Sequence, residues 1–156
     1  EGEPCWTIAR ECDGFIGEDG LGQTTEQNCK TPVGIFSART AFGIKANPGT
    51  AMDYVDVTED IWACGDREYY NQIIDAQKTG HSCESGEHMI ECSPMYNYGF
   101  ELNYNADNEF GKGSAIFVHC IGPAPYTGAC VAVPEEDMKY ILQNSDMGIK
   151  ICIKQL

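Results

Sequence analysis

The stretch that decides the fold runs from Gly113 to Met138 and reads GSAIFVHCIGPAPYTGACVAVPEEDM. Its first part, Ser114–His119, is a run of β-prone apolar residues ending in a histidine, which predicts a mostly buried strand. A loop rich in glycine and proline follows, and these residues favour turns that reverse the chain. The reversal returns Cys130 toward His119. We therefore predict that this segment places a thiol close to an imidazole.

The side chains of Cys130 and His119 are those of a nucleophile and its base. A thiol attacks a carbonyl as the thiolate, and a nearby imidazole generates the thiolate by accepting the proton. Behind Pro134, the segment Glu135–Gln143 carries apolar residues at helical spacing, which predicts an amphipathic helix. If its N-terminus points at the sulfur, the helix dipole favours the thiolate, whereas the acidic first turn opposes it. We therefore expect the pKa of Cys130 to lie modestly below its usual value of about 8.5.

The same stretch resembles the core motif of the L,D-transpeptidase (YkuD-type) catalytic domains of bacterial cell-wall enzymes. The nearest likeness is a subgroup that reads H-C, a proline-containing loop, and then T-A-G-C-V-A. Upstream segments extend the resemblance in the family's order, from about Gly14 to the C-terminus: Thr31–Phe36, Ala41–Gly43, Asn47–Thr50, Trp62, Tyr70–Asn71, Ser85–Glu87 and Tyr104–Asn105. The resemblance implies one catalytic domain over residues 1–156, mainly β with short helices, as a β-sandwich or mixed sheet.

In that family a cysteine is acylated by the carbonyl of an L-configured stem-peptide centre, a histidine is the base, and backbone N–H groups hold the oxyanion. The resemblance therefore implies six site residues: the catalytic pair Cys130 and His119, the oxyanion-binding backbone of Gly128 and Ala129, and the substrate contacts Tyr126 and Thr127. The implied activity is L,D-transpeptidation or L,D-carboxypeptidation of peptidoglycan stem peptides through a cysteine thioester. It needs no cofactor and no metal.

The chain departs from the family's commoner S-H-G-C pattern, because it reads Thr127-Gly128-Ala129-Cys130. A methyl group at Ala129 is tolerated only if the φ angle of that residue is negative. Ala132 stands where the commoner motif has an arginine, so a cation for a substrate carboxylate is missing there. An alternative therefore stays open: a non-catalytic cell-wall-binding or interaction module on the same fold.

Composition and charge limit the cellular compartments and the binding partners that are expected for the protein. Nine cysteines among 156 residues favour an oxidising compartment, and the odd number leaves one free thiol after full pairing, a state that suits Cys130. The formal net charge of −14 opposes binding to nucleic acid or to an anionic membrane. No apolar stretch is long enough to span a bilayer, and no signal peptide is visible. We expect a secreted protein of the cell envelope that does not insert into membranes.

Other segments predict further elements, and the alternation of apolar residues over Tyr96–Tyr104 is the strongest strand signal in the chain. Strands are expected at Val33–Ala38, Tyr54–Thr58, Tyr96–Tyr104 and Ile149–Ile153, and a short helix at Asp66–Gln77.

A second group of residues has the chemistry of metal ligands. His81, Cys83, His88 and Cys92 lie close in sequence, and zinc prefers nitrogen and sulfur ligands. Their spacing matches no defined zinc motif, so the preferred interpretation is bridged cysteines with exposed histidines.

Overall fold

The computed structural model describes residues 6–156 and is mainly β, with three sheets and short helices, as the sequence predicts. The α-helices are α1 (Ala76–Thr79) and α2 (Glu135–Gln143). Short 3₁₀ turns occur at Arg67–Tyr69, Met89–Glu91 and Met95–Asn97. Helix α2 has the bounds that the apolar spacing after Pro134 predicts.

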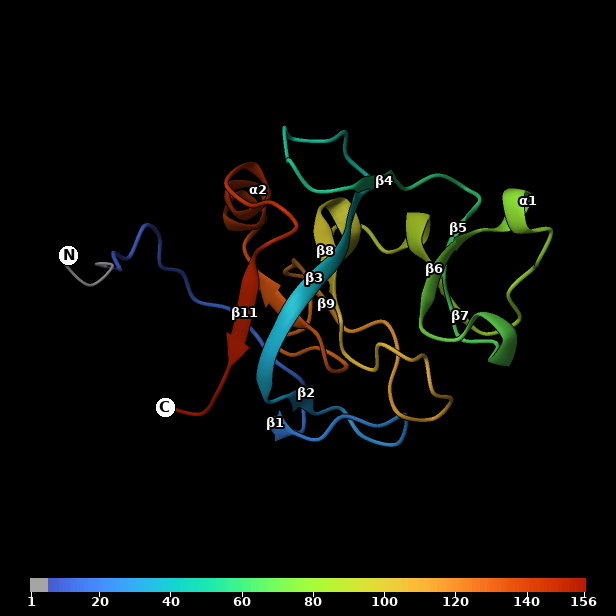
Figure 1. Ribbon diagram of the computed structural model, residues 1–156, viewed down its shortest axis with the longest axis horizontal. Coiled ribbons are helices and arrows are strands. Elements are labelled where there is room, and N and C mark those ends of the chain that lie inside the picture. Colours follow the sequence, from blue (N-terminus) through green and yellow to red (C-terminus); the bar gives the residue numbers. More distant parts are fainter. Residues whose placement is uncertain (1–5) are drawn as a thin grey trace.

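The central sheet organises the molecule, with its strands in the order β10-β9-β8-β3-β11 and β4 also paired to β3 (Figure 1). Its strands are β3 (Gly34–Gly43), β4 (Tyr54–Asp56), β8 (Gly99–Leu102), β9 (Phe117–Cys120), β10 (Val131–Val133) and β11 (Lys150–Ile153). Strand β10 runs parallel to β9, and β4 runs parallel to β3, whereas the other pairs are antiparallel. The long β3 is irregular between Ala38 and Ala41 where it pairs with β8.

Two smaller sheets flank the central one. Strands β5 (Ile61–Cys64), β6 (Gln72–Asp75) and β7 (Gly86–His88) form an antiparallel sheet that lies at the right of Figure 1. Strands β1 (Leu21–Gly22) and β2 (Thr31–Pro32) form a short parallel pair near the lower end of β3 (Figure 1).

The core has two parts, one on each face of β9. On one face, Val118 and Cys120 belong to a cluster with Met138 and Leu142 of α2. On the other face, Phe117 packs with residues of the small β5-β6-β7 sheet and with Cys130. Side chains alternate along a strand, so this division places Cys120 away from the candidate site, as its position beside His119 predicts.

The predicted helix at Asp66–Gln77 is wrong. The segment forms a 3₁₀ turn, then strand β6 paired along β5, and only the four-residue helix α1. Asn71 breaks the helical pattern because its φ angle is +61°. Ile73 and Ile74 lie next to each other on β6 and are compatible with a strand as well as with a helix.

The alternating segment Tyr96–Tyr104 is only partly a strand. Strand β8 covers Gly99–Leu102, and its start is delayed because Met95–Asn97 forms a 3₁₀ turn. The predicted strand at Ser114–His119 also shifts, since β9 begins at Phe117 and ends at Cys120.

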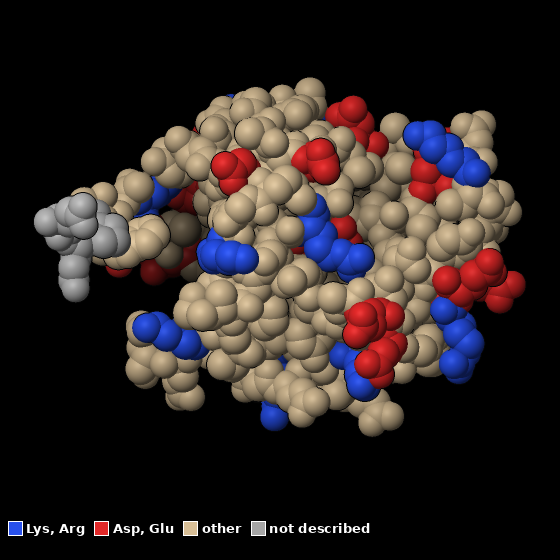
Figure 2. All heavy atoms as spheres, in the orientation of Figure 1, with Lys and Arg blue, Asp and Glu red and all other residues tan. Residues whose placement is uncertain are grey.

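Charged side chains are spread over the surface. On the face that Figure 2 shows, lysine and arginine side chains alternate with aspartate and glutamate among many uncharged atoms. Within residues 6–156, no helix is both long and apolar enough to cross a membrane.

Candidate functional site

Strands β9 and β10 bring the two predicted catalytic residues to one face of the sheet. In their parallel register, Ala132 lies opposite His119. Cys130 is two residues before Ala132 and has the same parity, so its side chain points to the same face as that of His119. The loop between the strands thus returns the thiol to the face of the sheet that carries the imidazole, although no hydrogen bond joins the two side chains.

A cavity of about 510 Å³ opens over this face. All six residues implied by the family resemblance line it: Cys130, His119, Gly128, Ala129, Tyr126 and Thr127. Tyr126 is half exposed, whereas Thr127 is buried. The hydroxyl of Thr127 donates a hydrogen bond to the carbonyl of Cys130 at 2.6 Å, so Thr127 stabilises the loop. Of the two implied substrate contacts, Tyr126 is the one whose side chain a ligand can reach.

The Cys130 thiol is buried and bonded on both sides. Its Sγ accepts a hydrogen bond from the N–H of Phe117 at 3.3 Å, and its S–H donates to the carbonyl of Ala115 at 3.2 Å. Burial raises the pKa of Cys130 to about 12; the Phe117 N–H lowers it and the charge of Glu87 raises it further. The expected depression of this pKa is therefore wrong, because desolvation outweighs every stabilising contact.

The second expectation behind a low pKa, a helix dipole aimed at the sulfur, is also wrong. Helix α2 begins only after strand β10 and Pro134, about 15 Å along the extended chain from Cys130. A helix dipole acts over roughly its first turn. The first residue of α2, Glu135, instead accepts hydrogen bonds from Lys45 Nζ at 2.8 Å and Asn97 Nδ2 at 2.6 Å.

His119 is arranged as a neutral base. Its Nδ1 lies 2.7 Å from the backbone carbonyl of Cys120, and because a carbonyl only accepts, Nδ1 carries the proton. Nε2 then holds the lone pair, and within residues 6–156 it has no protein hydrogen-bond partner. Burial lowers the pKa of His119, with the Cys120 carbonyl opposing, so the ring stays neutral near pH 7. The edge of the Tyr96 ring packs against it, with the centroids 5.5 Å apart.

The backbone around the cysteine offers unpaired donors. The N–H groups of Gly128, Ala129 and Cys130 donate to no protein acceptor within the described part of the chain. The φ angle of Ala129 is not positive, so the backbone accommodates the methyl group that replaces the glycine of the commoner motif. Buried Thr31 holds the loop from behind, because its hydroxyl lies 2.8 Å from the carbonyl of Ala129. Successive free N–H groups beside a nucleophile are the donors that an oxyanion requires.

Two residues outside the six implied site residues support the thiol. Ala115, whose carbonyl accepts the Cys130 hydrogen bond, has a φ angle of +53°, which is uncommon for a residue with a side chain. Buried Asn71 accepts a hydrogen bond from the N–H of Ala115 at 3.1 Å and fixes this conformation. Asn71 belongs to the Tyr70–Asn71 segment of the family resemblance, which was the only sequence signal for it.

The opposite wall of the cavity carries negative charge. Glu87 on β7 accepts a hydrogen bond from the hydroxyl of Tyr96, and Glu26 accepts one from Tyr70. No lysine or arginine lines the cavity within the described residues. The absence of a cation at Ala132 is therefore not compensated by another side chain of the wall.

The cysteines pair less than their number predicts. Within residues 6–156 there is one disulfide, Cys64–Cys83, and the remaining cysteines are thiols, with Cys130 among them. Cys5 lies outside the described residues. Burial explains why Cys120 forms no disulfide, since its side chain packs on the α2 face of the sheet and donates a hydrogen bond to the Tyr98 carbonyl.

The four residues with the chemistry of zinc ligands are divided in space, and of the two cysteines Cys83 is bridged, as the sequence favours, whereas Cys92 is a free thiol. His88 stacks on Trp62 and its Nε2 lies 2.7 Å from the carbonyl of Glu59. Cys92 contacts the carbonyl of His88. His81 and Cys83 instead lie with Cys64 and Asp66, and these four are a group of residues able to hold a metal ion.

No protein-family model, no curated protein and no solved structure matches this chain. The function is therefore inferred from the geometry of the cavity and from the motif that lines it.

Proposed function

We propose that the chain is a cysteine acyltransferase of the L,D-transpeptidase type, secreted to the cell envelope, that acts on peptidoglycan stem peptides. The observation that carries this proposal is one cavity lined by Cys130, by His119 with a free Nε2, and by the Gly128–Cys130 backbone, whose N–H groups are unpaired. These are the parts of covalent acyl transfer: nucleophile, base and oxyanion donors. The motif resemblance supplies the substrate class.

The first half-reaction acylates the enzyme. With a substrate carbonyl in the cavity, the Cys130 S–H leaves the carbonyl of Ala115 and turns toward His119. The sulfur then forms a bond to the carbonyl carbon as its proton passes to Nε2. Because the pKa of the resting thiol is about 12, proton transfer accompanies the attack rather than preceding it. The new oxyanion lies against the N–H groups of Ala129 and its neighbours.

The second half of the cycle releases both products. The C–N bond of the tetrahedral intermediate breaks, and protonated His119 gives its proton to the leaving amine of the D-amino acid. A thioester on Cys130 remains. An acceptor amine then attacks the thioester to form a cross-link, or water attacks it to form a trimmed stem. His119 accepts the proton of the attacking group and returns it to the Cys130 sulfur as the C–S bond breaks.

Release of the terminal D-amino acid from a synthetic tetrapeptide stem tests the activity. We expect release by the wild-type chain, with and without an added acceptor amine, and none by Cys130→Ser. A matched control is Cys152→Ser, because Cys152 is exposed on β11 and far along the sheet from the cavity. A folded wild-type chain that releases no D-amino acid from any L,D stem contradicts the proposal.

The second candidate function is a non-catalytic module that binds the cell wall. It is favoured by the state of the resting thiol, which is buried, neutral and bonded to the Ala115 carbonyl as in a structural cysteine. This candidate predicts that wild type and Cys130→Ser co-sediment equally with purified cell-wall sacculi, without release of D-amino acid. Release that depends on Cys130 rules it out.

A further inference from the structure

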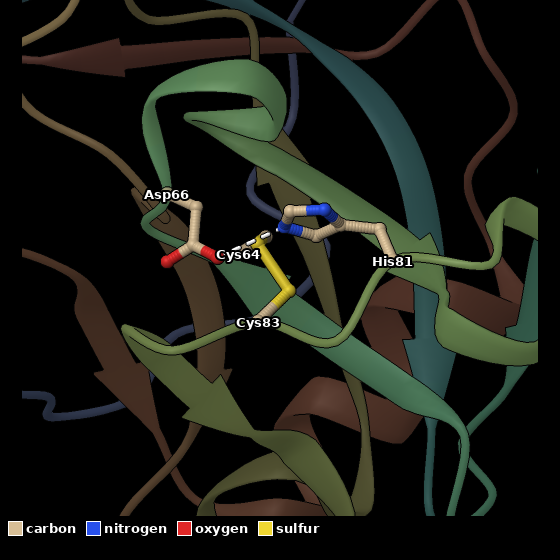
Figure 3. A group of neighbouring side chains, drawn as sticks. All are labelled: Cys64, Asp66, His81 and Cys83. Atoms are coloured by element: carbon tan, nitrogen blue, oxygen red, sulfur yellow. Dashed lines mark hydrogen bonds and ion pairs between the residues drawn. A yellow bond between two sulfur atoms is a disulfide. The ribbon is translucent and has the colours of Figure 1, made fainter.

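A second cluster of reactive side chains lies beside the candidate cavity but does not line it, at the end of β5. Cys64 closes that strand, Asp66 follows it, and His81 and Cys83 come from the loop that leads to β7. One ligand atom from each of the four lies within 4.8 Å of all the others. Figure 3 shows the His81 ring and the Asp66 carboxylate turned toward the two sulfur atoms.

The donor set is that of a closed zinc site. It offers two sulfurs, one imidazole nitrogen and one carboxylate oxygen, and structural zinc takes four such ligands in a tetrahedron. Zinc bonds of about 2.0–2.3 Å separate neighbouring ligand atoms by roughly 3.3–3.8 Å. The four atoms lie within 4.8 Å of one another, about 1 Å beyond this range, so once the two bonded sulfurs have separated, side-chain rotations bring the set around an ion.

Outer hydrogen bonds already orient the oxygen and nitrogen donors. Oδ1 of Asp66 accepts from both the N–H and the hydroxyl of Ser85, each at 2.8 Å, and Oδ2 accepts from the N–H of Glu84 at 2.9 Å. The Tyr69 ring packs against His81, with the centroids 4.8 Å apart. Nε2 of His81 faces Oδ2 of Asp66 at 2.9 Å. The bonds from Ser85 and Glu84 come from outside the ligand set and support metal binding, whereas the Asp66–His81 bond joins two ligand atoms and breaks when an ion binds.

The Cys64–Cys83 disulfide decides whether these donors are available, because the two sulfurs are bonded to each other. We propose that the cluster of Cys64, Asp66, His81 and Cys83 is a redox-gated zinc site, which binds Zn²⁺ when this disulfide is reduced. A dithiol reductant gives two electrons and two protons, breaks the S–S bond and becomes a disulfide itself. Zn²⁺ then replaces the two thiol protons and is held by two thiolates, the carboxylate and neutral imidazole.

The zinc site is independent of the proposed acyl transfer. It joins the end of β5 to the loop before β7, the two segments that the disulfide links in the oxidised chain. Cys64 and Cys83 are 5.8 Å apart between Cα atoms, so an ion bridges the same two segments as the S–S bond. Gly65 and Gly86, next to this junction, line the catalytic cavity. In a reducing environment, zinc thus keeps β5 joined to the loop before β7 while the disulfide is open.

Metal titration of the full chain tests the site. The protein is reduced with a phosphine, the phosphine is removed, and Co²⁺ is added under anaerobic conditions. We expect visible absorption bands of tetrahedral, thiolate-bound Co²⁺ that saturate at one equivalent and are displaced by Zn²⁺. The oxidised chain is expected to give no such bands. Reduced wild type without tetrahedral bands overturns the proposal.

Variants separate this cluster from the other thiols of the chain. His81→Ala and Asp66→Asn retain all cysteines and are expected to weaken metal binding by more than the roughly 10–100-fold that loss of an outer hydrogen-bond partner costs. The matched controls His88→Ala and Cys92→Ser remove the other two residues that have the chemistry of zinc ligands and lie near His81 and Cys83 in sequence. Both are expected to bind the metal as the wild type does. Undiminished binding in His81→Ala, or loss of binding in the two controls, overturns the proposal. Far-UV circular dichroism identifies folded variants.

Discussion

Cys130 and His119 face one cavity from neighbouring strands, yet their resting hydrogen bonds go to the backbone, the thiol to Ala115 and the imidazole to Cys120. The sequence identified the two residue types and brought them to one side, because a strand that ends at His119 and a turn that reverses the chain are local signals; strand β10 was not predicted. It did not predict the state of the thiol. That state depends on how deeply the fold buries the sulfur, which the local sequence does not encode.

The raised pKa gives a direct prediction for the resting thiol. At pH 7 a thiol with a pKa of about 12 has on the order of a thousandfold less thiolate than one at the usual value of about 8.5. We expect alkylation of Cys130 by iodoacetamide in the native protein to be very slow at pH 7 and to keep rising above pH 10. Peptide mapping after alkylation measures this, with exposed Cys152 as the internal reference. A Cys130 rate that levels off below pH 9 contradicts the account.

At the scale of elements, the loop before β10 is held mainly by one hydroxyl. Thr31 is fully buried, accepts a hydrogen bond from the N–H of Gly17 at 2.8 Å and donates toward the carbonyls of Ala129 and Cys130. Thr31→Val removes this hydroxyl and leaves the buried N–H of Gly17 unpaired. We expect the free energy of unfolding to fall by about 1–3 kcal/mol in urea. Exposed Thr58→Val is the control; an equal effect in both contradicts the role of Thr31.

Elements defined by neighbours in sequence were predictable, and those defined by distant partners were not. Glu135–Gln143 forms the predicted helix because its apolar spacing, its acidic first turn and Pro134 are all local signals. The segment at Asp66–Gln77 carried a similar spacing but became strand β6, since β5 supplies a ladder and Asn71 a positive φ angle. Asn71 also bonds to the distant Ala115, a contact that no local pattern predicts.

For the whole molecule, the small β5-β6-β7 sheet lines one side of the candidate cavity, and within residues 6–156 the disulfide Cys64–Cys83 joins it covalently to the loop before β7. The sequence separation of 19 residues implies that this bridge stabilises the chain by about 3 kcal/mol. The cysteine count favoured disulfides but could not give their partners, since pairing depends on which loops the fold brings together.

Replacement of both bridged cysteines measures that stabilisation. We expect the double variant Cys64→Ala, Cys83→Ala to lose about 3 kcal/mol of unfolding free energy in metal-free urea titrations under oxidising conditions. Cys12→Ala, which removes an exposed free thiol, is expected to change it by less than about 0.5 kcal/mol. A double variant as stable as wild type shows that the sheet holds without the bridge.

The central claim is that Cys130 forms an acyl-enzyme with the help of His119, and intact-protein mass spectrometry tests it most directly. After incubation with a tetrapeptide stem or a carbapenem, the account predicts one acyl adduct on wild type and on Cys152→Ser, mapped to Cys130. It predicts no adduct on Cys130→Ser and acylation slowed about 10²–10⁴-fold in His119→Ala. An adduct that persists undiminished in Cys130→Ser, or a folded wild-type chain that forms none, contradicts the account.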